Sequence, residues 1–80
     1  MSHDNTVVVL EEIFRIVFDR PADSAVAGIR QMSEQAWDSL AHVTLVSAIE
    51  SEFGITIDTA DAIELTSFEA FRIYLEEQRR

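Results

Sequence analysis

The sequence contains no cysteine, no lysine, one proline and only two glycines among its 80 residues. Without cysteine it can form neither a disulfide nor a thiolate metal site, and the two histidines, His3 and His42, cannot hold a structural zinc ion by themselves. The scarcity of glycine and proline, with 48% apolar residues, argues against disorder or a loop-rich scaffold. We expect residues 1–80 to form a single domain whose stability depends on efficient helix packing.

Positive charge is absent from the middle of the chain. The formal net charge is −9, and residues 31–71 contain no arginine or lysine. The carboxylates of this stretch are Glu34, Asp38, Glu50, Glu52, Asp58, Asp61, Glu64 and Glu69. Binding to nucleic acid or to an anionic membrane is therefore disfavoured, and protein partners should be basic. A solubilising surface explains most acidic small domains, so the clustering gives only modest support for a docking face.

Long hydrophobic runs and a basic leader are also missing. Residues 1–10 lack the basic start of a secretory signal. The best apolar stretch, residues 7–18, is interrupted by Glu11, Glu12 and Arg15 and is too short to span a bilayer. We therefore expect a cytoplasmic monomer that does not insert into membranes.

Hydrophobic periodicity predicts an all-α fold, a four-helix bundle with a long first connection and a short third helix. The apolar residues of the first helix are Val7, Leu10, Phe14, Val17 and Phe18. Glu11 and Arg15 form an i,i+4 pair on its other side, and Pro21 should end the helix near Asp19. Residues 20–37 show no sustained period, which predicts a connection held in place by Val26, Ile29 and Met32.

The second helix is predicted from a stripe that Leu45 widens, formed by Leu40, Val43, Val46, Ile49 and Phe53. Asp38 or Ser39 is expected to cap its N-terminus, and Gly54 to end it in the left-handed conformation. The five phenylalanines, Phe14, Phe18, Phe53, Phe68 and Phe71, are predicted to lie in the core.

The last two helices are shorter. Ile55 and Ile57 alternate with Thr56 as in an extended link, after which Asp58 or Thr59 is expected to cap a brief third helix. Thr66 and Glu69 have capping-box spacing before a fourth helix. Its apolar stripe is Phe68, Phe71, Tyr74 and Leu75, and it is expected to end in Arg79 and Arg80.

Ser39 follows the long connection and opens the second helix, so its hydroxyl can project into solvent, where an external enzyme could reach it. A phosphate attached there would lie near free backbone N–H groups and the positive end of the helix dipole, although Asp38 partly opposes that benefit. His42 lies one turn later, but the sequence shows neither an orienting acid nor an oxyanion hole. We therefore predict no catalytic residue and no metal ligand, and a solvated or partner-facing histidine.

The stretch Trp37-Asp38-Ser39-Leu40-Ala41-His42-Val43, continued by Glu50-Ser51-Glu52-Phe53-Gly54-Ile55, resembles the modification site and second helix of the acyl carrier protein family. The order and spacing of the other helices match that family across nearly the whole chain. The resemblance implies that a phosphopantetheinyl transferase moves 4'-phosphopantetheine from coenzyme A to Ser39, and that the chain is not an enzyme. It also accounts for the missing cysteine, because the prosthetic group then supplies the thiol.

The same resemblance implies docking to basic patches of acyl-loading, acyl-transfer or condensing enzymes in fatty-acid, polyketide or specialised lipid biosynthesis. The predicted partner-binding residues are Trp37, Asp38, Leu40, Ala41, His42, Thr44, Glu50, Glu52 and Asp61. Ala41, Thr44 and Ser51 stand where fatty-acid carriers commonly have acids. A Trp before Asp-Ser-Leu is similar to stand-alone carriers of specialised pathways. Trp37 is predicted either to guide partners or to anchor the loop over the start of the second helix.

Two alternatives stay open at this point. A carrier of aminoacyl or peptidyl thioesters in a pathway of the nonribosomal-peptide kind shares the site chemistry, so the sequence does not separate it from an acyl carrier. An unmodified helical interaction module, which only resembles a carrier, is the alternative from another functional class.

Overall fold

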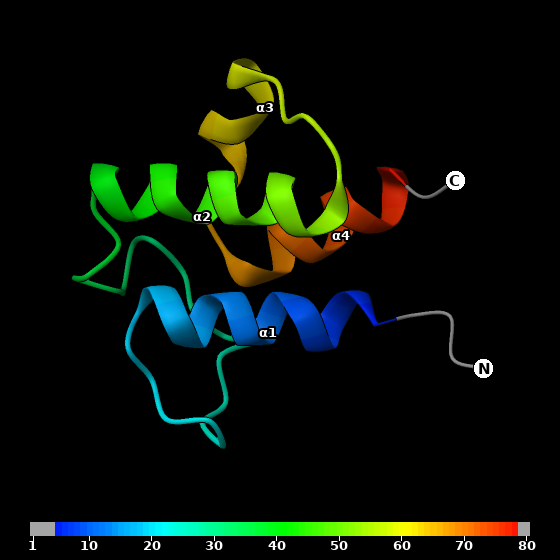
Figure 1. The fold of residues 1–80 in the computed structure, drawn as a ribbon. Helices are drawn as coiled ribbons and strands as arrows, with labels where there is room; N and C mark the ends of the chain where they lie inside the picture. Colours follow the sequence, from blue (N-terminus) through cyan, green and yellow to red (C-terminus); the bar gives the residue numbers. More distant parts are fainter. Residues whose placement is uncertain (1–4, 79–80) are drawn as a thin grey trace.

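The structure, a computed structural model, describes residues 5–78 and places four helices in that part of the chain. They are α1 (Thr6–Val17), α2 (Ser39–Phe53), α3 (Thr59–Glu64) and α4 (Phe68–Gln78). Helices α1 and α2 lie antiparallel, α4 packs against α1, and α3 lies on the far side of α2 from α1 (Figure 1). The predicted all-α bundle with a short third helix is confirmed.

The first connection has no helix, as predicted for residues 20–37. Helix α1 ends before Asp19, which takes a left-handed φ of 54°, and Pro21 disfavours helical geometry at the residue before it. The far part of the connection is tied to the start of α4 by two backbone hydrogen bonds. The Gln31 N–H donates to the Thr66 carbonyl at 2.9 Å, and the Phe68 N–H donates to the Ile29 carbonyl at 3.0 Å.

Side chains hold the connection as well, though not all of those predicted. Val26 is buried and Ile29 packs against the core, but Met32 is 90% exposed, so its predicted anchoring role is wrong. Two ionic side chains contribute instead. The Arg15 Nε donates to the Ser24 carbonyl at 2.9 Å, and Arg20 pairs with Glu34.

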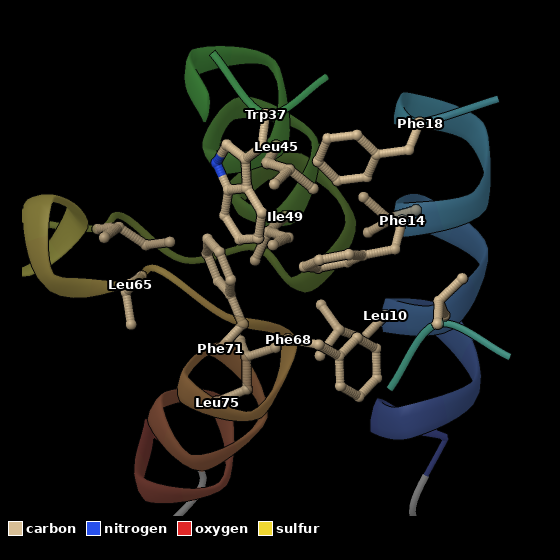
Figure 2. Close-up of a cluster of buried hydrophobic side chains, with 13 residues drawn as sticks. Leu10, Phe14, Phe18, Trp37, Leu45, Ile49, Leu65, Phe68, Phe71 and Leu75 are labelled. Atoms are coloured by element: carbon tan, nitrogen blue, oxygen red, sulfur yellow. The ribbon is translucent and has the colours of Figure 1, made fainter. Parts of the chain in front are cut away.

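Aromatic rings fill the centre of the bundle (Figure 2). Phe14, Phe68 and Phe71 are almost fully buried. The Phe14 ring contacts those of Phe68 and Phe71 edge-on, with centroids 5.0 and 5.9 Å apart, an arrangement that the ring quadrupole favours. Phe18 is also buried, whereas Phe53 is only partly buried at the edge of the core. The prediction that all five phenylalanines lie in the core is therefore wrong for Phe53.

The face of α2 that packs against the core is not the predicted face. Leu45 and Ile49 are its fully buried residues, whereas Leu40 is 75% exposed and Val43 is 60% exposed. The helix carries apolar residues on more than one face, so periodicity alone does not select the face that packs. Leu45, predicted only to widen the stripe, is in fact at its centre.

The residues at the helix ends agree with the predictions for α2 and differ from them for α3 and α4. The Asp38 side chain caps α2, and Gly54 ends it in the left-handed conformation with φ of 65°, both as predicted. At α4 the cap is Ser67, whose Oγ accepts from the Ala70 N–H at 2.9 Å, so the predicted Thr66–Glu69 capping box is wrong. At α3 Asp58 occupies the N-cap position, but its side chain makes no capping bond. His3, Arg79 and Arg80 lie outside the described residues.

Candidate functional site

Ser39 is the first residue of α2 and is exposed to solvent. The residue before it, Asp38, is in extended geometry and turns the chain into the helix. Its Oδ1 accepts a hydrogen bond from the Ala41 N–H at 2.9 Å. The first amides of a helix have no acceptor inside it. The Ala41 amide is satisfied by the cap, which leaves the amides of Ser39 and Leu40 without an acceptor within α2. An anion joined to Ser39 would meet these amides and the positive end of the helix dipole.

Trp37 fixes the loop that carries Ser39. Its side chain is 3% exposed, and its ring packs edge-on against Phe14 and stacks on Phe71, with centroids 5.6 and 6.3 Å apart. Figure 2 shows this ring pointing into the middle of the core from the loop end of α2. Of the two predicted roles, anchoring the loop is therefore the one that the structure supports. Direct contact with partners is excluded for this side chain because it is buried.

His42 links the loop, α2 and α3. The Trp37 Nε1–H donates to His42 Nδ1 at 3.0 Å, and His42 Nε2 lies 2.8 Å from the Ala62 carbonyl oxygen. An indole N–H can only donate and a carbonyl can only accept, so Nδ1 must be unprotonated and Nε2 must carry the proton. The prediction of a freely solvated histidine is thus wrong, since both ring nitrogens are bonded within the fold, while contact with a partner stays a prediction. His42 is a half-buried bridge between the loop, α2 and α3.

We expect His42→Leu to lower the free energy of unfolding by about 1 to 3 kcal/mol, because it leaves the buried Trp37 N–H without an acceptor. Urea unfolding followed by circular dichroism measures this loss. The Trp37→Phe, His42→Leu double variant removes donor and acceptor together, so it should cost less than the two single changes added. Strictly additive single changes would contradict a Trp37–His42 interaction.

Two of the acids predicted to contact partners accept hydrogen bonds within the fold. Glu50 Oε2 accepts from the Ile57 N–H at 2.7 Å and so fixes the link between α2 and α3. Asp61 accepts from the Tyr74 hydroxyl at 3.4 Å. Burial, and then the nearby Asp61 carboxylate, raises the pKa of Tyr74. Glu50 is half-buried, whereas Asp61 and Glu52 remain exposed, and so they keep a surface that a basic partner could meet.

An exposed apolar patch adjoins Ser39. It consists of Leu40, Val43 and Ile63, which are 75%, 60% and 69% exposed. Beside it a groove of about 250 Å³ runs between α2 and α3, with Val43, Val46 and Ile63 in its walls. Val43 and Ile63 were missed as candidate contact residues. The signal was present in α2, whose apolar residues outnumber those that one packed face needs.

The remaining predicted contact residues are spread along α2. Ala41 is half-buried against the core and Thr44 is exposed, with its Oγ1 donating to the Leu40 carbonyl at 2.9 Å. Ser51, the third position without an acid, is exposed near the end of the helix. The structure therefore gathers Ser39, Leu40 and Val43 at one end of α2, and places Ser51 and Glu52 at the other.

The family model described as the phosphopantetheine attachment site matches residues 10–75. The chain belongs to this family. Among solved structures, it is similar to a protein from Mycobacterium tuberculosis assigned as an acyl carrier protein, with a TM-score of 0.78 and 16% sequence identity. That match covers 90% of this chain and 96% of the other. No curated protein gives a significant match.

Family membership makes the chain a phosphopantetheine-dependent carrier, not an enzyme in its own right. Carriers of this family receive 4'-phosphopantetheine covalently from a phosphopantetheinyl transferase and present it to biosynthetic enzymes. The start of α2 fits that group, since an exposed hydroxyl, free amides and the helix dipole meet there. Within residues 5–78, no helix is both long and apolar enough to cross a membrane.

Proposed function

We propose that Ser39 carries the 4'-phosphopantetheine arm and that the protein delivers acyl groups as thioesters to successive enzymes. The observation that supports this assignment best is an exposed serine at the first position of α2, held there by a buried Trp37 anchor. In this proposal Ser39 Oγ supplies the ester oxygen, and the amides of Ser39 and Leu40 bind the phosphate. The arm supplies the thiol that the chain lacks.

Other serines of the described chain are less suited to modification. The Ser24 and Ser33 hydroxyls donate to the Pro21 and Arg30 carbonyls, and Ser67 caps α4. Ser47 and Ser51 lie inside α2, away from free helix amides. Ser39 therefore combines access with an anion-binding environment.

The carrier's own contribution to the pathway is tethering. An attached intermediate is held at high effective concentration for each enzyme that docks, without bond chemistry by the carrier. Among cargo classes we favour acyl groups over aminoacyl groups, supported by the similarity to an acyl carrier fold. A single carrier domain over residues 1–80 and a cytoplasmic location stay predictions.

We further propose that dedicated enzymes use this carrier. The surface of α2 lacks acids at Ala41, Thr44 and Ser51, and Glu50 is engaged with the Ile57 amide. Three exposed carboxylates, those of Asp58, Asp61 and Glu64, lie on or just before α3. Electrostatic complementarity acts chiefly on encounter rate and partner choice, so enzymes that need a densely acidic second helix should load this carrier slowly.

The proposal is tested by incubating the protein with a promiscuous phosphopantetheinyl transferase and coenzyme A, followed by intact-mass and peptide mass spectrometry. We expect one phosphopantetheine per chain, located on the peptide that contains Ser39. A protein that gains no mass would instead be the unmodified interaction module. Modification at Ser24, Ser33, Ser47, Ser51 or Ser67 would overturn the assignment of the site.

A further inference from the structure

A second groove, between α1 and α2, is not used by the modification site. Its volume is about 410 Å³, within the roughly 300 to 1,000 Å³ range of ligand-binding clefts. Its α1 wall is aliphatic and includes Val9, Ile13 and Ile16. Ile16 is 78% exposed. Helix α1 is thus more apolar than its packing against the core requires, which is typical of an interaction surface.

Most of the side chains in the α2 wall of this groove are short and uncharged. Thr44, Ala48 and Ser51 line it, and their i, i+4, i+7 spacing places them on one side of the helix. Two of them, Thr44 and Ser51, are positions at which the sequence lacks the acids expected from the resemblance to fatty-acid carriers. The absence of long charged side chains there leaves the groove open to apolar groups.

The charged residues that line the groove are acidic. Glu12 and Glu52, both exposed, line it, and none of its described lining residues is basic. The Arg15 side chain of α1 interacts with other groups. Its Nη2 lies 3.8 Å from Glu11 Oε1, and its Nε donates to the Ser24 carbonyl. An occupant with arginine or lysine beside its apolar residues would complement these carboxylates. A second copy of this chain, with its net charge of −9, would instead meet like charge.

We propose that the α1–α2 groove docks an amphipathic helix of a partner protein. Aliphatic side chains of that helix enter the groove between Ile16 and Ala48, and its arginine or lysine residues meet Glu12 and Glu52. This helix-in-groove arrangement follows a common mode of peptide recognition. The inference goes beyond the proposed function and does not need the arm, although a docked enzyme would use both.

The position of the groove suits a carrier that must be held while its arm works. Thr44 lies five residues after Ser39, which is a rise of about 7.5 Å along the helix. The groove that Val43 and Ile63 line lies instead between α2 and α3, and α3 is on the other side of α2 from α1 (Figure 1). A partner helix in the groove would therefore grip the carrier on the α1 side of α2 and leave Ser39 and the α3 side accessible.

The test uses the full unmodified chain and two designed peptides. One is an amphipathic helix with a leucine stripe flanked by arginines, and the other has glutamates in place of the arginines. In a nitrogen-15 NMR titration, we expect the arginine peptide to shift amides centred on Ile16, Thr44 and Ala48. The glutamate peptide should bind at least about tenfold more weakly.

Matched variants locate the binding site. Thr44→Arg should weaken the arginine peptide at least about tenfold, because it places bulk and positive charge in the groove. Thr59→Arg, at an exposed threonine of α3, is the charge-matched control and should bind as the parent does. Both positions are exposed, so both variants should fold. A Glu12→Gln, Glu52→Gln double variant should remove the preference between the two peptides while leaving the groove open.

Three results would overturn the proposal. They are shifts centred on Val43 and Ile63, equal affinity of the parent for both peptides, or the same shifts appearing with protein concentration alone, which would indicate self-association. Ser39→Ala should bind the arginine peptide like the parent. A protein that takes up phosphopantetheine but ignores the peptide would contradict only the groove, and one that binds the peptide but stays unmodified would contradict only the carrier function.

Discussion

Ser39→Ala is expected to abolish phosphopantetheine loading completely while changing the free energy of unfolding by no more than about 1 kcal/mol. The stability effect is small because Asp38, not Ser39, caps α2, and because the Ser39 side chain is exposed. The loading effect is total because, in the proposed function, the Ser39 hydroxyl oxygen is the atom that is esterified. Intact-mass spectrometry after transferase treatment measures phosphopantetheine loading, and urea unfolding measures the free energy of unfolding.

Ser47→Ala is the matched control for this variant, since Ser47 is also an exposed serine of α2. It should load like the parent. A Ser39→Ala protein that still gains the mass of phosphopantetheine would show that another residue is modified. One that is unfolded where the parent is folded would reveal a structural role for the hydroxyl that no contact in the structure indicates.

Phe14→Ala is expected to cost about 3 to 5 kcal/mol of unfolding free energy, the largest loss we predict for a single substitution. Its side chain is fully buried, and its ring contacts four others, those of Phe18, Trp37, Phe68 and Phe71. Truncation would remove these edge-on and tilted contacts and leave a cavity where α1, α4 and the Ser39 loop meet. Chemical denaturation followed by circular dichroism measures the loss.

Phe53→Ala serves as the comparison because it deletes the same atoms from a partly buried position at the edge of the core. It should cost clearly less than Phe14→Ala. Equal losses for the two variants would mean that Phe53 contributes as much to the core as the buried Phe14 ring. A loss below about 1 kcal/mol for Phe14→Ala would contradict the packing shown in Figure 2.

Helix positions and ends were predictable where local chemistry decides them. Pro21 and Gly54 act on the backbone of their own neighbourhood, and the Asp38 cap needs only the next helical turn, so the sequence identified these ends correctly. At α4 both Thr66 and Ser67 carry a hydroxyl suited to capping. Ser67 forms the cap because the Thr66 carbonyl accepts instead from the Gln31 N–H of the first connection. Gln31 is distant from Thr66 in sequence.

Which face of a helix packs was harder to predict. In α1 the buried residues Leu10 and Phe14 belong to the predicted stripe. In α2 Leu40 and Val43 are as apolar as Leu45 and Ile49, yet the first two are exposed. Apolar residues on several faces leave several rotations with similar local pattern, and only the positions of α1 and α4 select one.

Roles that depend on long-range contacts were also beyond the sequence. Trp37 was left between two interpretations and His42 was predicted to face solvent or a partner, because the acceptor at Ala62 lies 20 residues further along the chain. Glu50 looked like a docking acid because its Ile57 partner comes from the link that follows. The candidate modification residue itself, Ser39, was predicted from a local pattern and lies exposed at the start of α2, as that pattern indicated.

The loop that carries Ser39 depends on residues synthesised later. Phe68 binds the Ile29 carbonyl through its backbone, and Phe71 stacks on Trp37, so α4 completes the support of a site that lies more than twenty residues before it in the chain. During translation, Ser39 leaves the ribosome ahead of these contacts. The nascent chain therefore presents the serine before its final geometry exists. Under the proposed function, a transferase that recognises the folded start of α2 would have to act after α4 has emerged and packed.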